Sequence, residues 1–219
     1  MYERIVMEET DLHVASRVPV RDEVISRVAE ARNIINGYIN GYPEFKVSLE
    51  PMEARPGAHE IIAGMCREAK KAGVGPMASV AGAIAKFAGE AIRGEIIIEN
   101  GGDIYIKSEI SRKVMVYAGN SPLSGKFAVT LAPGVWGVAS SAGTFGHSVS
   151  FGRADAAMVV SRDAVLSDAA ATGLGNRLKS AADIESALDW VLGIAGVTGA
   201  LCVVDGRMGI EGDIVLGGI

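Results

Sequence analysis

Apolar residues in the first third of the chain recur at the spacing of α-helices. Residues 21–39 place valine and isoleucine side chains on one face, and two acidic residues stand in the first turn, where they favour the positive end of a helix. A second helix is expected over residues 58–71, which Ala72 and Gly73 end. Residues 78–92 form a third predicted helix of small, mostly uncharged residues, so its backbone can be approached closely.

Strand-length apolar segments follow, separated by glycine turns. They cover residues 95–99, 104–108, 113–117, 127–131, 137–141 and 156–160, and two more extended segments lie at residues 4–7 and 12–15. Helical spacing returns over residues 165–178 and 182–192, before strands at 200–204 and 207–210. This order predicts an α+β fold in which antiparallel or mixed sheets are flanked by helices.

No linker rich in proline or serine divides the chain, so residues 1–219 are expected to form a single domain. Two passages share the order of a small-residue helix, a β-segment and a glycine turn: residues 82–102 and residues 169–206. Two interpretations are open. Either the chain contains an internal duplication, with two related lobes facing each other around a central cleft, or the two passages are unrelated.

Composition and charge argue against several classes of protein. Apolar residues make up 49% of the 219 residues and charged residues 21%, as in globular proteins. The net charge is -5 and no run of Lys or Arg exceeds two residues, which argues against nucleic-acid binding. No apolar run approaches the roughly 18 to 20 residues of a transmembrane helix, and the charged N-terminus does not resemble a signal peptide, so a cytoplasmic location is expected.

Cysteine and glycine content narrow the chemistry further. Cys66 and Cys202 are the two cysteines, and neither has a Cys or His neighbour at metal-ligand spacing, which argues against a zinc or iron-sulfur site. The 28 glycines are about 13% of the chain, against a typical ~7%. This excess indicates tight turns or a backbone that approaches a ligand closely.

The first candidate binding segment is Asn100-Gly101-Gly102-Asp103, which directly follows an apolar strand. Paired glycines at the end of a strand expose consecutive backbone N–H groups, which can donate hydrogen bonds to an anionic or carbonyl oxygen. Asp103 would hold the loop or accept a hydrogen bond from a ring N–H. The alternative is an ordinary hairpin in which Asn and Gly supply the positive φ angles.

The second candidate segment is polar although it follows a strand. It contains Ser140, Ser141, Gly143, Thr144, His147 and Ser148. So many hydroxyl groups beside glycines indicate a ligand surface, and a histidine can act as a general acid or base near neutral pH. We therefore predict ligand contacts along this segment and a catalytic role for its His-Ser pair. The alternative is a flexible serine-rich loop.

The third candidate is the pair Asp168 and Thr172 at the start of a predicted helix. Residues four apart share one helical face, so the carboxylate and the hydroxyl can converge on an oxygen-seeking cation such as Mg²⁺. The alternative is local: an acidic residue in a first turn complements the helix dipole, and threonine often bonds back to a carbonyl.

In this order, these segments resemble those of the ApbE-like superfamily, whose best-known members transfer FMN from FAD to a protein threonine with Mg²⁺. Asp168-Ala169-Ala170-Ala171-Thr172 is similar to the family's Asp-Ala-Leu-Ala-Thr helix start, in which the Asp and Thr are metal ligands. Gly101-Gly102-Asp103 is similar to a Gly-Gly-Asp loop of the family. Ser140-Ser141-Ala142-Gly143 stands where the family has Thr-Ser-Gly-Asp. The resemblance implies an ApbE-like fold and a flavin site.

A fourth segment, Gly82-Ala83-Ile84-Ala85-Lys86, resembles the family's Gly-(Gly/Ala)-Ile-Ala-Lys-Gly-Tyr-Ala, whose alanine carbonyl helps to hold the metal. The resemblance implies this role for Ala85, although Phe87 replaces Gly-Tyr and one residue is missing. Over nearly the whole chain the sequence is most similar to a short branch of the superfamily with no settled reaction. Some archaeal members are associated with sulfide-dependent amino-acid biosynthesis.

Three functions are therefore open. The first is Mg²⁺-dependent binding or processing of FAD, FMN or a similar phosphorylated ligand, as a transferase-like or pyrophosphatase-like enzyme. The second is an enzyme of sulfur or homocysteine-type amino-acid biosynthesis, with Cys66 or Cys202 as a sulfur carrier. The third is a non-catalytic ligand-binding module. Glycine-rich helices also serve as interfaces, so a homo-oligomer is a further alternative.

Overall fold

The computed structural model describes residues 1–143 and 152–218. Its centre is an eight-stranded sheet in which every neighbouring pair of strands is antiparallel. In spatial order the strands are β1 (Tyr2–Met7), β2 (Thr10–Ser16), β3 (Ile96–Asn100), β4 (Asp103–Ser108), β7 (Gly134–Ser141), β8 (Ala156–Ser161), β9 (Val197–Val204) and β10 (Arg207–Gly212). Because β4 pairs directly with β7, the N-terminal and C-terminal halves of the chain share one sheet.

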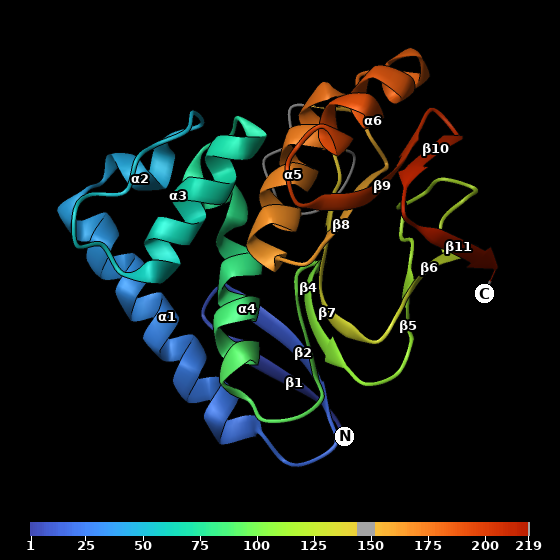
Figure 1. Ribbon diagram of the computed structural model, residues 1–219. Helices are drawn as coiled ribbons and strands as arrows, with labels where there is room; N and C mark the ends of the chain where they lie inside the picture. The colour runs from blue at the N-terminus through green and yellow to red at the C-terminus, as the bar shows by residue number, and fades with distance from the viewer. Residues whose placement is uncertain (144–151, 219) are drawn as a thin grey trace.

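A second sheet covers part of one face of the first. Its three strands lie in the order β11 (Val215–Gly218), β6 (Phe127–Leu131) and β5 (Arg112–Met115). A hydrophobic cluster joins the two sheets, with Val129 and Leu131 of β6 beside Ile106 of β4 and Met158 of β8. In Figure 1 this small sheet stands on the side of the large sheet away from the helices.

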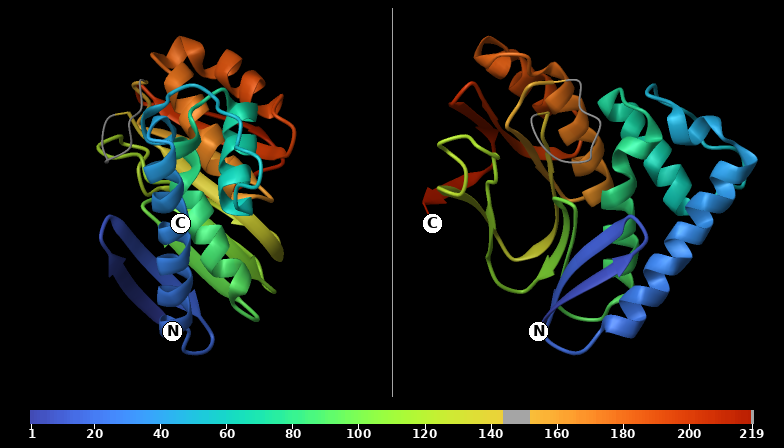
Figure 2. Two further views of the ribbon diagram at one scale, coloured as in Figure 1. Left: turned by 90° about the vertical axis from the view of Figure 1, so that its left-hand side faces the viewer. Right: turned by 180° about the vertical axis from the view of Figure 1, so that it is seen from behind.

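Helices cover the opposite face, as the two further views show (Figure 2). Each of three helices lies on one pair of strands: α4 (Val80–Ala91) on β3 and β4, α5 (Ala164–Arg177) on β7 and β8, and α6 (Ile184–Leu192) on β9 and β10. Outside them lie α1 (Arg21–Gly41), against α4, and α3 (Glu60–Ala72), against α5. The short α2 (Glu44–Val47) and the 3-10 turns η1 (Pro76–Ser79) and η2 (Ala181–Asp183) complete the described helical structure.

The burial of α5 follows from its place between a sheet and another helix. Its alanines and glycines are enclosed on both sides, by β7 and β8 and by α3, and small residues allow the helix axes to approach. At Gly173, a Cβ atom would meet the Trp190 ring and the carbonyl oxygen of Ala72. Of the polar residues of α5, Ser167 and Asp168 are buried as well, whereas Thr172, Asn176 and Arg177 keep some exposure.

The α+β fold predicted from the sequence is confirmed, and the predicted helices and strands are present with ends shifted by a few residues. The sequence prediction missed α2 and β11. The first is a single turn of four residues, too short to show helical periodicity, and the second contains two glycines among its four residues.

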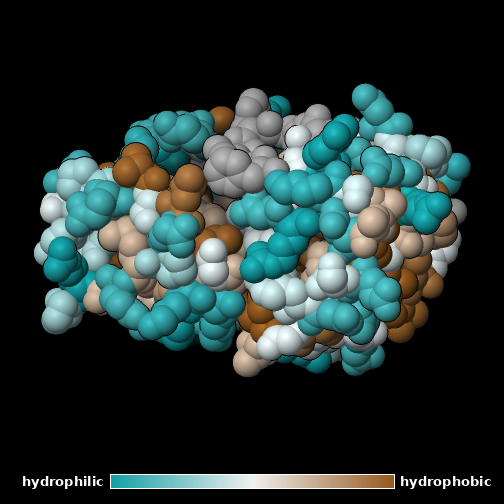
Figure 3. Space-filling model, turned by 90° about the horizontal axis from the view of Figure 1, so that it is seen from above, coloured by the Kyte–Doolittle hydropathy of each residue, from teal (hydrophilic) through white to brown (hydrophobic). Residues whose placement is uncertain are grey.

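The face of the molecule seen from above is largely polar (Figure 3). Viewed from above, hydrophilic residues predominate and hydrophobic residues form separate groups between them (Figure 3). Exposed large apolar side chains come from many elements, among them Tyr2 and Val6 on β1 and Met115 on β5. Among the described helices, none is both long enough and apolar enough to cross a bilayer.

Candidate functional site

A cavity of about 570 Å³ opens where α2, η1, α4, α5 and the β3–β4 hairpin meet. One wall is formed by residues 46–50, at the end of α2, and by the glycine-rich turn of residues 73–78. These two segments touch so closely that a Cβ atom at Gly75 would overlap the carbonyl of Ser48. The other wall carries the polar side chains Asp103, Asp168, Thr172 and Asn176.

Helix α5 contributes three of these side chains at intervals of four residues. Asp168, Thr172 and Asn176 lie on one face of the helix, since residues i, i+4 and i+8 align along an α-helix. Asp168 is buried, while Thr172 and Asn176 are partly exposed to the cavity. The helix thus presents a carboxylate, a hydroxyl and a carboxamide to one space.

The Asp168 carboxylate also binds the first turn of α4. It accepts hydrogen bonds from the backbone N–H of Gly82, at 2.8 Å, and from that of Ala81. The N-cap residue Ser79 does not perform this function, because its hydroxyl donates to the carbonyl of Pro76. Asp168 therefore satisfies two of the N–H groups that a helix start leaves without intrahelical partners.

This contact requires a glycine at position 82. A Cβ atom there would overlap the carbonyl oxygen of Ala164 and lie 2.9 Å from the Cβ of Asp168. Only with hydrogen at this position can the first turn of α4 approach α5 closely enough for the hydrogen bond to form.

The β3–β4 hairpin brings Asp103 to the same cavity. Asn100 pairs with Asp103 across a two-residue turn, in which Gly101 and Gly102 have φ angles of 66° and 104°. The Asp103 carboxylate accepts a hydrogen bond from the backbone N–H of Ser140. The Asn100 side chain donates to the carbonyl of Ala81 at 3.2 Å, which ties the hairpin to the start of α4.

Burial makes ionisation of both carboxyl groups unfavourable. It raises the pKa of Asp168 to about 7, although the two N–H groups of α4 oppose the shift. Burial, and then repulsion by Asp168 and Glu99, raises the pKa of Asp103 well above its ordinary value. Neither carboxylate forms an ion pair with a described Lys or Arg, and Lys46 is the one cationic side chain among the described residues of the cavity wall.

This donor set suits a hard divalent cation. Two carboxylates, a threonine hydroxyl and nearby backbone carbonyls are oxygen ligands of the kind that Mg²⁺ binds. The described residues contain no group of three or more His, Cys, Asp or Glu side chains that could hold a metal. A bound cation would therefore depend on these two carboxylates, together with neutral oxygen atoms.

The other residues predicted from the sequence have varied positions. Gly101 and Gly102 form the tip of the hairpin and are not part of the cavity wall. Ser141 is buried, and its hydroxyl has no hydrogen-bond partner among the described residues. Gly143 packs against the backbone of Gly152. The predicted roles of Thr144, His147 and Ser148 fall outside the described residues.

The alanine of α4 that lines the cavity is Ala81, whereas Ala85 is fully buried in the core one helical turn further along the helix. Lys46 and Asn176, for which no function was predicted from the sequence, also line the cavity. Asn176 continues the four-residue spacing of Asp168 and Thr172, so the sequence did contain a signal for it. Nothing in the local sequence marks Lys46.

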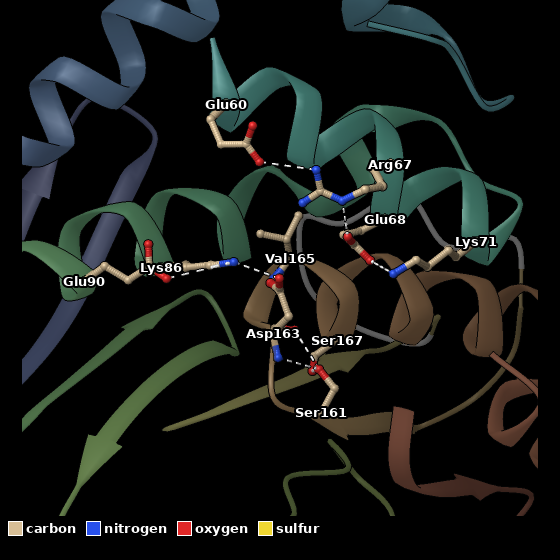
Figure 4. A network of polar contacts seen from close by, with 10 residues as sticks. All are labelled: Glu60, Arg67, Glu68, Lys71, Lys86, Glu90, Ser161, Asp163, Val165 and Ser167. Carbon is tan, nitrogen blue, oxygen red and sulfur yellow. Dashed lines mark hydrogen bonds and ion pairs between the residues drawn. The ribbon is translucent and has the colours of Figure 1, made fainter. Parts of the chain in front are cut away.

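A polar network between α4 and the N-terminus of α5 fixes the start of α5 (Figure 4). Lys86 of α4 points toward Asp163, at 2.7 Å, and Asp163 accepts from the backbone N–H of Val165 as the N-cap of α5. The hydroxyl of Ser167 donates to the carbonyl of Gly137 on β7. Lys86 is therefore engaged in a structural ion pair, which places α4 and α5 relative to each other.

The two cysteines are not arranged for thiolate chemistry. Cys66 lies on the buried face of α3, and burial raises the pKa of its thiol. Burial raises the pKa of Cys202, on β9 beside the edge strand β10, to about 11. Both thiols are therefore protonated near neutral pH, whereas a sulfur carrier acts as the thiolate.

Comparison with known proteins identifies the family of this chain. Residues 3–209 match the family model described as AbpE bacteria. The UPF0280 protein of Methanocella arvoryzae is 37% identical over 94% of this chain and 86% of its own length. The UPF0280 protein of Methanopyrus kandleri is 39% identical over 97% of this chain and 88% of its own length.

Solved structures show the same fold at low identity. The flavin transferase ApbE from Vibrio cholerae has a TM-score of 0.63 at 10% identity, over 97% of this chain and 96% of that chain. The ApbE protein from Thermotoga maritima has a TM-score of 0.65 at 12% identity, over 97% of each chain. By its sequence and its fold, the chain belongs to the AbpE bacteria family, within the ApbE-like superfamily, and is a member of the UPF0280 proteins.

Proposed function

We propose that this protein binds a flavin nucleotide, FAD or FMN, together with a divalent cation such as Mg²⁺ in the acid-lined cavity. The observation that carries the proposal is that Asp103, Asp168 and Thr172 line one cavity, and that no described cationic side chain pairs with either carboxylate. Two enclosed carboxylates without counter-charge are costly to ionise, and a bound cation removes that cost.

The cavity suits a phosphorylated ligand because it has acidic side chains on one wall and a lysine on the other. Asp168 and Thr172 would hold the cation, with Asp103 beside them. Lys46 stands on the wall formed by the end of α2, and its ammonium group can attract phosphate oxygens. Bound Mg²⁺ neutralises phosphate oxygens and polarises the phosphorus to which they belong. Two structural neighbours are ApbE proteins, and the one from Vibrio cholerae is named a flavin transferase, which favours a flavin nucleotide as the ligand.

The reaction class that fits this ligand is cleavage of the FAD pyrophosphate. Attack by water on the phosphorus of the FMN half breaks the bond to the bridging oxygen and releases FMN and AMP. Attack by a protein hydroxyl gives an FMN ester and AMP instead. His147, as a general base that removes the proton of the attacking hydroxyl, belongs to the proposal.

Binding and cleavage can be tested on the purified protein. We expect FAD titrated in the presence of Mg²⁺ to bind, and EDTA to weaken binding strongly. Asp168→Asn keeps an acceptor for the N–H groups of α4 but removes the charge, and we expect it to reduce the Mg²⁺-dependent part of the affinity at least about tenfold, which corresponds to about 1.4 kcal/mol. Thr172→Val removes a neutral ligand and should have a smaller effect.

Asp189→Asn, an exposed substitution on α6, is the matched control and should bind as the unmodified protein does. Chromatography of the reaction mixture detects FMN and AMP if cleavage occurs. Absence of FAD and FMN binding with Mg²⁺ present would refute the proposal. Tight flavin binding that neither EDTA nor Asp168→Asn changes would instead identify a metal-independent binding module.

A further inference from the structure

A second cavity, of about 490 Å³, adjoins the acid-lined cavity. The two share four wall residues, Lys46, Met77, Val80 and Ala81. The second cavity extends from this shared wall along α1, toward the turn between β1 and β2. Because the same side chains border both spaces, one elongated ligand can occupy them together.

The second cavity differs in chemistry from the first. Its walls combine apolar side chains, Ile35, Ile39 and Ile84, with the carboxamides of Asn36 and Asn40. These two asparagines are four residues apart on α1 and are exposed, so they stand side by side on one face of the helix. Apolar walls with a few hydrogen-bonding groups are typical of sites for small organic molecules.

At its far end, the second cavity is lined by Arg32, whose positive charge is already paired with carboxylates. The guanidinium of Arg32 binds Glu8 and Glu9 and donates to the hydroxyl of Thr10 at 2.7 Å. Arg32 is therefore already neutralised and is a poor receptor for a further anion. Lys46 lies at the junction of the two cavities, and it forms no ion pair with a described residue, although it is near enough to Glu9 to interact with that charge. An anionic group of the ligand is thus expected at the junction, and a neutral group at the α1 end.

We infer that a nucleotide lies across both cavities, with its planar heterocycle in the cavity along α1. Its phosphates lie at Lys46 and in the acid-lined cavity. Asn36 and Asn40 recognise the edge of the ring, since a carboxamide offers both a donor and an acceptor to the alternating polar atoms of such a ring. The apolar side chains contact its faces. This inference rests on the proposed function and adds which end of the ligand each cavity receives.

The test compares ligands with and without a heterocycle. The unmodified protein, the double variant Asn36→Ala/Asn40→Ala and Lys46→Gln are titrated calorimetrically with FAD, FMN, AMP and inorganic pyrophosphate, all with Mg²⁺. We expect the double variant to bind its preferred nucleotide about 10-fold or more weakly and to bind pyrophosphate unchanged. Lys46→Gln should weaken the binding of nucleotide and of pyrophosphate alike.

Asn33→Ala is the matched control, because Asn33 is an exposed asparagine of the same helix that does not line the cavity. It should change no affinity. Unchanged nucleotide binding in the double variant would overturn the inference and leave the proposed function intact. An equal loss of nucleotide and pyrophosphate binding in that variant would also overturn it, because the effect would not depend on the ring. If the unmodified protein binds none of the nucleotides, both proposals fail.

Discussion

At the scale of single residues, buried carboxyl groups of this protein differ in pKa according to the hydrogen-bond donors and cations around them. Asp168 has two backbone N–H donors but no ion pair with a described Lys or Arg, and burial raises its pKa to about 7. Glu95 is also nearly enclosed, with 6% of its side chain exposed. Its pKa is lowered to about 2, first by the backbone N–H of Glu109 and then by the Ser108 hydroxyl and by Arg17. Glu95 is therefore a stabilising anion, and Asp168 an anion that requires compensation.

A pH dependence of stability follows for Glu95. A carboxyl group with a lowered folded-state pKa stabilises the fold above its unfolded pKa, and this contribution is lost as pH falls from about 4.5 to about 2. Glu95→Gln should therefore lower the free energy of unfolding at pH 7, and the difference from the unmodified protein should shrink as the pH approaches 2. Urea denaturation at several pH values measures it. Glu211→Gln, on the exposed edge strand β10, is the control, and a difference for Glu95→Gln that is constant with pH would contradict the assignment.

At the scale of elements, the site depends on the close approach of α4 and α5. Asp168 of one helix receives N–H groups from the first turn of the other, and Lys86 pairs with the N-cap residue of α5. These contacts hold the two helices in a fixed relative position. Both helices, held in this relative position, are consequently needed to form the cavity wall between them.

Two glycine substitutions separate this packing effect from helix propensity. Gly82→Ala places a methyl group against the carbonyl of Ala164, so it should destabilise the protein by about 1–3 kcal/mol. Gly37→Ala, within α1 and with open space around it, should stabilise by about 0.4–1 kcal/mol. Thermal or urea unfolding of both variants checks the opposite signs. A neutral or stabilising Gly82→Ala would show that α4 and α5 are further apart than described.

At the scale of the whole molecule, ligand binding should raise the stability of the fold. The cavity is formed by segments from the end of α2 to α5, and an unfolded chain cannot assemble it. Ligand at about 100 times its dissociation constant adds about 2.7 kcal/mol. For a domain of this size, that corresponds to a rise in Tm of roughly 5 to 10 °C.

Thermal unfolding with FAD and Mg²⁺ together measures this coupling. The rise in Tm should be largest with both present and smaller with FAD and EDTA. In Asp168→Asn, the Mg²⁺-dependent part of the rise should disappear, while Asp189→Asn should retain it. If the Mg²⁺-dependent rise in Tm were equal in the two variants, the stabilisation would not depend on the Asp168 carboxylate.

The sequence by itself determined most of the secondary structure and part of the site. Periodicity is a local property, so the long helices and the apolar strands were predictable from spacing alone. The pair of Asp168 and Thr172 was also predictable, because residues four apart on a helix share a face whatever surrounds them. The double-glycine turn before Asp103 needed only the positive φ angles that glycine permits.

Only the tertiary structure decided which of these local features meet. Asp168 and Gly82 are 86 positions apart, and their contact depends on the packing of two helices against neighbouring strands of one sheet. Lys46 and the turn of residues 73–78 reach the cavity through the fold of a connecting segment that carries no periodic signal. Backbone carbonyls and N–H groups are identical in every residue, so the sequence could not show that the wall is formed by Ala81 and not by Ala85.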